Sequence, residues 1–273
     1  MLMKIAIQGI KGSFHHKVAQ EFFTPDVAVT ECASFPILIE SLQSGMSTDA
    51  VMAIENSIAG AILPNYALLD QYDVNIEGEY YLSIQHHLMA LDGQSINDIN
   101  EVWSHPMAHL QCQEFFREYP HIKLVEDIDT ADVARRIQEQ QLTGIAAIAS
   151  KAAAKIYGLE ILAKSIQTIK DNATRFFILN TNGKVEHLDA TKASLRITTD
   201  HNRGSLAAVL NVLSDCKLNL TKIQSMPIIE RPWEYAFFID VTFEDYKDYS
   251  KAKKVMQILA KDFKVLGEYK NAK

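Results

Sequence analysis

The sequence predicts an α/β protein followed by a smaller α+β unit. In the first two-thirds of the chain, short apolar segments typical of strands alternate with amphipathic segments of helical period. In the last third, the order becomes strand, helix, strand, strand, helix, strand, which is the order of a ferredoxin-like sandwich. The polar, turn-rich stretch 181–192 between these parts is typical of a linker.

The α/β part begins with a β-α-β-α-β order. Strands are expected at 4–10, 28–32 and 49–57, and helices at 15–23 and 36–45, the second closed by Gly45. This order predicts a largely parallel sheet, in which ligands bind beyond the carboxyl ends of the strands.

A second lobe is expected between about Tyr81 and Ile166. Its strands are predicted at 79–91, 99–106, 122–129 and 144–150, and its helices at 107–119, 130–142 and 150–158. The segment 159–169 then leads to the apolar strand 175–180. Because the chain would cross between two lobes twice, we expect a cleft that holds a small molecule.

The α+β unit is predicted from its periodicity. Strands are expected at 193–200, 218–228, 233–243 and 264–269, and helices at 204–216 and 249–263. The first helix has one apolar face of Leu206, Val209, Leu210 and Leu213, and the third strand alternates in period two from Tyr235 to Phe243.

Bulk composition excludes several classes of function. The net charge of −7 and pI of about 5.7 argue against a nucleic-acid partner. Cys32, Cys112 and Cys216 are far apart and form no CxxC pair, which favours reduced thiols over disulfides or a cysteine metal site. The amino terminus lacks the pattern of a signal peptide, and no stretch of 18 apolar residues exists, so we expect a cytoplasmic protein without membrane contact.

The stretch "NATRFFIL" places Thr174 and Arg175 directly before a buried strand. Either the strand begins at the surface, or its end opens on an anionic ligand. The turn with Gly9, Gly12 and Ser13 has a similar ambiguity, because Ser13 can cap a helix or help to bind a carboxylate.

Polar residues also follow later strands. Glu55, Asn56 and Ser57 end the third strand, where either a ligand site or a turn with a helix cap is expected. In "SHPMAHLQC", Ser104 is a candidate cap for a helix starting at Pro106, and Cys112 is expected to be a buried structural thiol rather than a nucleophile.

The acids of "EDIDTAD" are expected at a helix N-terminus. Asp129 or Thr130 would be its cap, and the other carboxylates would lie close to the positive end of the helix dipole.

In this order, "KGSF", "ENSIAG", "SHPMAHLQC", "DTADVA" and "NATRFFIL" resemble the prephenate dehydratases, and "GSLAAVL" with "LNLTKIQSMP" resembles their ACT regulatory domain. The resemblance covers nearly the whole chain. It implies a two-lobed catalytic domain like the type 2 periplasmic binding proteins at residues 1–185, with lobes at about 1–80 plus 167–185 and at 81–166. It also implies an ACT domain at 193–270.

The resemblance further implies conversion of prephenate to phenylpyruvate with feedback by L-phenylalanine, in a homodimer or homotetramer, with no metal or other cofactor. It implies Thr174 as hydrogen-bond donor to the departing oxygen and Arg175 as a carboxylate clamp or a structural ion pair. Substrate would be bound by Ser13, Asn56, Ser57, Ser104, Gln111, Thr130 and Phe176. Phenylalanine would be bound by Gly204, Ser205, Leu206, Ala207, Asn219, Gln224 and Ser225.

The sequence departs from the family at several positions. Ile10 stands where proline is usual, His15 where a small hydroxyl residue is common, and Asp129 where serine is common. In the regulatory motif Gln224 and Met226 replace a glutamate and an arginine, and Arg203 replaces a proline, which leaves the strength of phenylalanine control open.

Two alternatives remain open at this point. Arogenate dehydratases run the same chemistry on an amino analogue, and a binding-protein fold with an ACT module also suits a non-catalytic amino-acid sensor. No helical segment precedes the first strand, so a fused chorismate mutase is not expected.

Overall fold

The computed structural model describes residues 3–183, 187–200, 202–228 and 231–273. Three residues of the expected linker, 184–186, and the expected domain end at 185 therefore lie outside the described part. The chain divides into two compact units, Met1–Gly60 with Tyr81–Arg175 and Ala61–Tyr80 with Phe176–Lys273.

The first sheet begins as the alternating pattern predicts. Its strands run in the order β2-β1-β3-β11-β5 with β4 beside β3, and β1 is parallel to both β2 and β3. The strands are β1 (Lys4–Gln8), β2 (Ala28–Cys32), β3 (Asp49–Asn56), β4 (Gly60–Ala61), β5 (Asn75–Ser83) and β11 (Ala173–Asn180), and the helices α1 (Phe14–Phe22) and α2 (Phe35–Gln43) connect the first three. β5 and β11 continue from one unit into the other.

The second sheet lies wholly in the first unit, in the order β10-β6-β9-β7-β8. Its strands are β6 (His87–Ala90), β7 (Glu101–Ser104), β8 (Lys123–Glu126), β9 (Ile145–Ala149) and β10 (Glu160–Ala163). Its helices are the 3-10 helix η1 (Ile96–Asp98), α4 (Pro106–Gln111), α5 (Gln113–Phe116), α6 (Thr130–Gln140) and α7 (Lys151–Tyr157).

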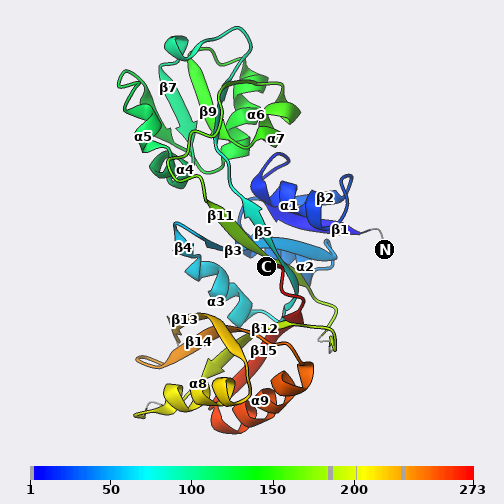
Figure 1. Cartoon of the computed structure of the whole chain (residues 1–273). Helices are drawn as coiled ribbons and strands as arrows, with labels where there is room; N and C mark the ends of the chain where they lie inside the picture. Colours follow the sequence, from blue (N-terminus) through cyan, green and yellow to red (C-terminus); the bar gives the residue numbers. More distant parts are fainter. Residues whose placement is uncertain (1–2, 184–186, 201, 229–230) are drawn as a thin grey trace. The chain divides into compact units, whose positions relative to one another are not determined.

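This sheet is covered on both faces, with α4 and α5 on one side and α6 and α7 on the other (Figure 1). Ala146 and Ile148 of β9 pack in the core cluster that contains Ala108 and Phe116, whereas Ala147 packs in the opposite cluster with residues of α6. Burial of both faces explains why the sequence of β9 is apolar without alternation.

Two predicted elements are interrupted. The strand expected at 79–91 is two strands in different sheets, because β5 ends at Ser83 and β6 begins at His87. The helix expected at 107–119 is broken between α4 and α5 at Cys112, whose φ of −111° and ψ of 10° are not helical. No glycine or proline lies at either break, so the sequence pattern gives no signal that the strand or the helix is interrupted there.

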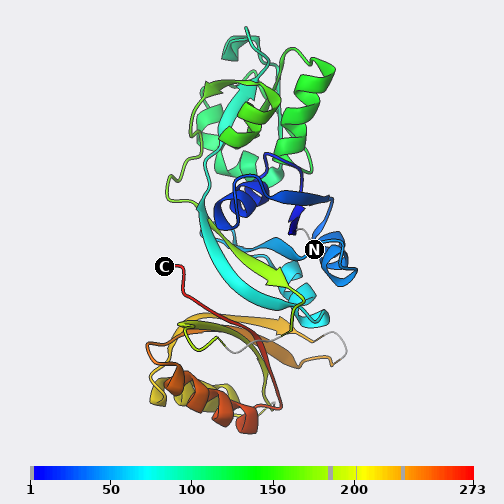
Figure 2. The same cartoon turned by 90° about the vertical axis from the view of Figure 1, so that its right-hand side faces the viewer.

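The second unit carries a four-stranded antiparallel sheet in the order β13-β14-β12-β15. Its strands are β12 (Lys192–Thr198), β13 (Asn219–Pro227), β14 (Tyr235–Thr242) and β15 (Asp262–Tyr269), and α8 (Ser205–Asp215) and α9 (Tyr246–Leu259) lie together on one face (Figure 2). The predicted element order β-α-β-β-α-β is confirmed.

The other face of this sheet is also partly covered, which the sequence did not predict. The unit includes α3 (Leu63–Gln71), and the ring of its Tyr66 packs 5.1 Å from that of Phe238 on β14. Phe238 is therefore buried at 2% exposure although it lies opposite the predicted apolar face. In the same unit, Lys192 donates to both carboxylate oxygens of Glu79 at 2.9 Å, and both side chains are buried.

Candidate active site

Thr174 and Arg175 open β11 inside the protein, not at its surface. Thr174 is 9% exposed and Arg175 is 3% exposed, and the interpretation of a strand that begins in solvent is therefore wrong. The neighbouring Phe176 is 1% exposed and continues the buried strand. A buried hydroxyl and guanidinium need polar partners, and their partners come from β3 and β5.

The Thr174 hydroxyl is held by Asn56 at the end of β3. Asn56 Nδ2 lies 2.9 Å from Thr174 Oγ1 and 2.7 Å from Asn172 Oδ1, and Asn56 Oδ1 accepts from the backbone N–H groups of Ile58 and Ala59 at 3.0 and 2.9 Å. Asn56 thus donates to the threonine, whose own hydroxyl proton has no acceptor among the described residues.

Ser57 joins the first turn after β3 to β11. Its N–H donates to the carbonyl of Ala173 at 2.8 Å, and its Oγ accepts from the Ala173 N–H at 3.0 Å. This reciprocal pair fixes the backbone directly before Thr174, so both polar residues after Glu55 position the threonine. The expectation of a simple turn with a helix cap after β3 is wrong, since β3 is followed by β4 and then α3.

Arg175 has a charged and an aromatic neighbour. Its Nη1 lies 3.9 Å from Glu55 Oε2, and its guanidinium carbon lies 5.9 Å from the centre of the Tyr81 ring. The ion pair is at the long end of salt-bridge distances, and the Glu55 side chain is 35% exposed. Both predicted roles of Arg175, clamp and structural pair, fit this geometry.

Gln111, at the end of α4, connects the second sheet with this group. Its Oε1 accepts from Asn172 Nδ2 at 2.9 Å and lies 2.9 Å from His86 Nε2. His86 lies in the connection between β5 and β6, where its N–H donates to Gln167 Oε1 and its carbonyl accepts from the Ile166 N–H. Burial lowers the pKa of His86 to about 4, so its imidazole is neutral at pH 7.

Ser104 does not cap α4. The cap is His105, whose Nδ1 accepts from the Met107 N–H, and the expectation of a Ser104 cap is therefore wrong. Ser104 is fully buried and donates to the carbonyl of Ile148 on β9 at 2.8 Å, so its hydroxyl presents no surface to a ligand.

The glycine turn after β1 is a packed junction. Ser13 accepts from the His16 N–H and caps α1, as one of the two interpretations expected. The N–H groups of Lys11 and Gly12 donate to Glu31 and His16 within the protein, so they do not form a cradle for a carboxylate.

Glycine is required at both positions of this turn. Gly9 and Gly12 have φ of +85° and +93°, which favours glycine. A Cβ on Gly9 would lie 2.4 Å from Asp129 Oδ2, and a Cβ on Gly12 would lie 3.0 Å from Ala153 Cα. The Ser150 hydroxyl and the Tyr157 hydroxyl, each at 2.6 Å, donate to the carbonyls of Gly12 and Lys11.

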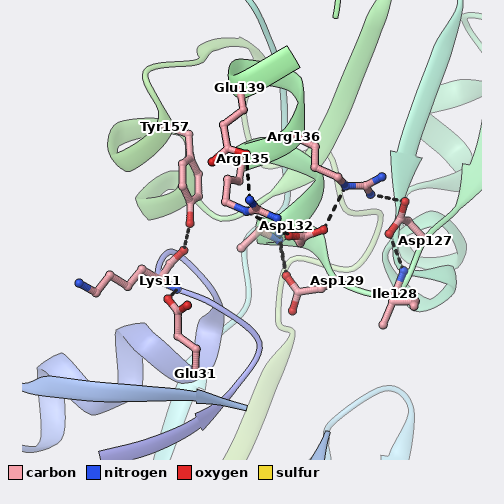
Figure 3. A network of polar contacts seen from close by, with 11 residues as sticks. Lys11, Glu31, Asp127, Ile128, Asp129, Asp132, Arg135, Arg136, Glu139 and Tyr157 are labelled. Atoms are coloured by element: carbon pink, nitrogen blue, oxygen red, sulfur yellow. Dashed lines mark hydrogen bonds and ion pairs between the residues drawn. The ribbon is translucent and has the colours of Figure 1, made fainter. Parts of the chain in front are cut away.

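The acids near Asp129 serve the start of α6, as predicted. Asp129 Oδ1 accepts from the N–H groups of Ala131 and Asp132 at 2.8 and 2.9 Å, and Thr130 is the first residue of the helix. Figure 3 shows Arg135 and Arg136 approaching Asp132, with Arg136 also bonded to Asp127. Burial raises the pKa of Asp129, because its Oδ2 lies against Gly9 away from water.

Cys112 is a buried free thiol, as expected. Burial raises its pKa to about 12, which makes it a poor nucleophile. Within the described residues, no group of three or more histidine, cysteine and acidic side chains could hold a metal ion, and no helix is long and apolar enough to cross a membrane.

The structure thus brings Asn56, Ser57, Gln111 and Thr174 into one network beside Arg175. In the described part of the chain, no hydrogen bond joins Ser13, Ser104 or Thr130 to it. Sequence reasoning missed Asn172 and His86. Asn172 was within the motif that carried the resemblance, two residues before Thr174, and His86 was visible only as one of two adjacent histidines.

The residues predicted to bind an effector lie in the second unit. Gly204 precedes α8 with φ of +82°, and Ser205, Leu206 and Ala207 form the first turn of that helix. Asn219 begins the edge strand β13, and Gln224 and Ser225 lie toward its end, where Gln224 Nε2 donates to the Ser225 carbonyl.

Comparison with known proteins identifies relatives over most of the chain. The family model described as prephenate dehydratase matches residues 5–184. A bifunctional chorismate mutase/prephenate dehydratase of Buchnera aphidicola subsp. Acyrthosiphon pisum is 34% identical over 237 residues, which cover 85% of this chain and 62% of that protein. An arogenate dehydratase/prephenate dehydratase 2, chloroplastic, of Arabidopsis thaliana is 32% identical, over 98% of this chain and 72% of that protein.

Two solved structures have similar folds. A protein titled as a novel type of quorum quenching acylase, GqqA, superposes with a TM-score of 0.89 at 25% identity and 98% coverage of both chains. A prephenate dehydratase from Arthrobacter aurescens, solved in complex with L-Phe, superposes with a TM-score of 0.89 at 24% identity, over 99% of this chain and 90% of that one. The chain thus spans 62% of the length of the Buchnera relative but nearly all of both solved structures.

Proposed function

Because this chain belongs to the prephenate dehydratase family, we propose that it converts prephenate to phenylpyruvate in L-phenylalanine biosynthesis. The observation that carries this proposal is the Thr174 hydroxyl, which accepts from Asn56 and whose own proton has no acceptor among the described residues. The resemblance predicted from the sequence is confirmed at the level of the family.

The reaction needs a hydrogen-bond donor and little else from the protein. The bond from the ring to its carboxylate breaks, its electron pair enters the ring, and the ring C–O bond breaks on the other side. The products are carbon dioxide, phenylpyruvate with its aromatic ring, and hydroxide, which takes one proton from solvent to become water. Thr174 donates to this oxygen as it gains charge, which stabilises the transition state more than the ground state.

Arg175 is proposed to hold a substrate carboxylate. Its buried guanidinium lies directly after Thr174 on the same strand, and the planar fork of a guanidinium matches the two oxygens of a carboxylate. Ser13, Asn56, Ser57, Gln111 and Thr130 are proposed to bind and orient the substrate. Ser104 and Phe176 are fully buried and would support the walls of the pocket from behind.

We also propose the finer architecture that the resemblance implies. Residues 1–185 would form a two-lobed catalytic domain and residues 193–270 an ACT domain; the family match to 5–184 and the β-α-β-β-α-β order support this division. The protein would act in the cytoplasm as a homodimer or homotetramer.

Control by phenylalanine is part of the proposal. The effector would bind between Gly204–Ala207 and the strand from Asn219 to Ser225 and shift the enzyme toward a less active state. A relative of the same fold was solved in complex with L-Phe, which makes this amino acid the effector to test first.

The test is turnover of prephenate by the chain purified without added metal. We expect phenylpyruvate to form, and we expect Thr174→Val to lower kcat by roughly 10²–10³-fold, as for removal of one transition-state donor, while Thr174→Ser retains the hydroxyl and much of the rate. Equal rates for Thr174→Val and wild type would refute the role of Thr174.

Substrate choice and control are tested in the same assay. Turnover of arogenate but not prephenate would reassign the substrate, which the Arabidopsis relative makes a specific second candidate. Turnover of neither, with the protein folded, would favour the amino-acid sensor. Activity unchanged by millimolar phenylalanine would contradict the proposed feedback.

A further inference from the structure

A continuous chain of side-chain hydrogen bonds joins Thr174 to His86 through three amides. From Thr174 it passes to Asn56, then to Asn172, then to Gln111 and finally to His86, with each step between 2.7 and 2.9 Å. All five residues belong to the first unit, but they come from β3, β11, the segment directly before β11, α4 and the connection between β5 and β6. The roles of Asn172 and His86 are not explained by the proposed chemistry itself.

The direction of every bond in this chain is determined. Backbone N–H groups can only donate, so the contacts of Ile58 and Ala59 identify the Asn56 atom facing them as oxygen. The Asn56 nitrogen must then face Thr174 and Asn172, and Asn172 must accept with its oxygen.

The same logic continues to the histidine. Since Asn172 accepts with its oxygen, its nitrogen donates to Gln111, whose oxygen is therefore the acceptor at this point. His86 Nε2 faces that same oxygen and must carry the proton. His86 Nδ1 is then the unprotonated nitrogen; it is buried and has no hydrogen-bond partner among the described residues.

Two residues of this chain, Thr174 and Gln111, each keep an unpaired donor, whereas the unpaired Nδ1 of His86 is an acceptor buried at the far end of the chain. The Thr174 hydroxyl accepts from Asn56 and keeps its proton for another partner. The Gln111 oxygen already accepts twice, and its NH₂ group has no hydrogen-bond partner in the described residues. Two unused donors and no unused acceptor at these positions suit a ligand rich in oxygen.

We propose that His86 and Asn172 are positioning residues, which fix Gln111 and Thr174 as donors toward the substrate. If the Gln111 amide turned over, its NH₂ would face the Asn172 NH₂ and the His86 N–H, so donors would oppose donors. The backbone of His86 is fixed at both its N–H and its carbonyl, and the Phe14 ring lies edge-on at 5.8 Å, so the imidazole cannot easily move away. The tests that measure turnover rest on the proposed function, whereas the assignment of the His86 tautomer does not.

The first test does not need the substrate. The ¹⁵N spectrum of the intact, histidine-labelled protein reports which ring nitrogen carries the proton, and the signals of His86 are identified by their loss in His86→Gln. We expect the neutral form protonated at Nε2 at pH 7. A neutral ring protonated at Nδ1, or a charged ring, would overturn the proposal whether or not the protein turns over prephenate.

The second test uses a matched pair of variants. Glutamine places an N–H donor the same number of bonds from Cα as His86 Nε2, whereas methionine is of similar length and has no donor there. We expect His86→Met to lower kcat/KM roughly tenfold, as for loss of one ordering hydrogen bond, and His86→Gln to retain most of the activity. Equal losses in the two variants would mean that His86 acts only through packing.

A double-variant cycle shows whether His86 acts through Gln111. In the Gln111→Ala background the group to be positioned is absent, so His86→Met should change kcat/KM by less than twofold there. Independent, multiplying losses would overturn the proposal. Absence of turnover in the wild type would instead refute the proposed function and leave the tautomer result standing.

Discussion

Replacement of Gly9 by alanine tests the packing of the turn that follows β1. Gly9 has φ of +85°, and an added Cβ would lie 2.4 Å from Asp129 Oδ2, which is held in place because Asp129 Oδ1 accepts two backbone N–H bonds. Gly45 is the matched control, because its φ is +70° but nothing lies within 4 Å of an added Cβ. The two substitutions share the backbone strain and differ in the collision.

The magnitude follows from these two contributions. Backbone strain at positive φ costs roughly 1–2 kcal/mol for a residue with a Cβ, and this is the whole cost expected for Gly45→Ala. In Gly9→Ala the carboxylate must also move by about 1 Å to reach ordinary contact, which breaks a helix cap worth about 0.5–2 kcal/mol. We therefore expect Gly9→Ala to be less stable than Gly45→Ala by about 0.5–2 kcal/mol.

Urea unfolding of the intact chain measures this difference. In Gly9→Ala/Asp129→Ala the collision is absent and the helix cap is lost only once. The destabilisation of the double variant should therefore be smaller than the sum of the two single destabilisations, by about the free energy of the cap. Equal destabilisation in Gly9→Ala and Gly45→Ala, or strict additivity in the double variant, would refute the reasoning.

Three further predictions concern other buried groups. Burial raises the folded-state pKa of Asp129, so its charge lowers the stability of the protein above that pKa, and this cost disappears below the unfolded value of 3.8. Asparagine keeps the helix cap without the charge. The stability of Asp129→Asn relative to wild type should therefore be most favourable at pH 7 and fall toward pH 4 in unfolding measurements across this range. Lys192→Met removes one partner of a buried ion pair with Glu79 and should cost about 3–5 kcal/mol in urea unfolding, most of which Lys192→Met/Glu79→Leu should recover. Cys112, with a pKa raised to about 12, should stay unmodified by iodoacetamide at pH 8 until the protein is unfolded, as mass spectrometry would show.

The order of the elements could be predicted because most helices and strands have one clear period. The exceptions are positions where the period continues while the chain changes direction. The strand pattern predicted over 79–91 shows no interruption near its middle, yet the chain leaves one sheet at Ser83 and enters another at His87. The break at Cys112 likewise lacks a glycine or proline. Helix α3 was missed because its residues show no strong apolar face.

The residue types of the candidate site were predictable, but their surroundings were not. Ser104 was expected at a helix cap and is instead bonded to a neighbouring strand, because His105 takes the capping position before Pro106. The partners of Ser104 and Thr174 are distant in sequence, at Ile148 and Asn56, and only the sheet topology brings them together. Local patterns contain no information about such contacts.

The hydrogen-bond chain shows how an acidic protein can prepare a site for an anion. The net charge of −7 opposes an anionic ligand, and Arg175 has Glu55 beside it. The additional donors, Thr174 and the Gln111 amide, are neutral and carry little desolvation cost compared with a buried cation. Neutral donors stay aimed at a ligand only if their orientation is fixed, and here the backbone amides of Ile58 and Ala59 fix it through Asn56 and Asn172. The affinity for an oxygen-rich ligand would then depend on bond direction as much as on charge, and an isosteric exchange such as Asn172→Asp, which reverses one bond, should harm the site more than its small change in shape suggests.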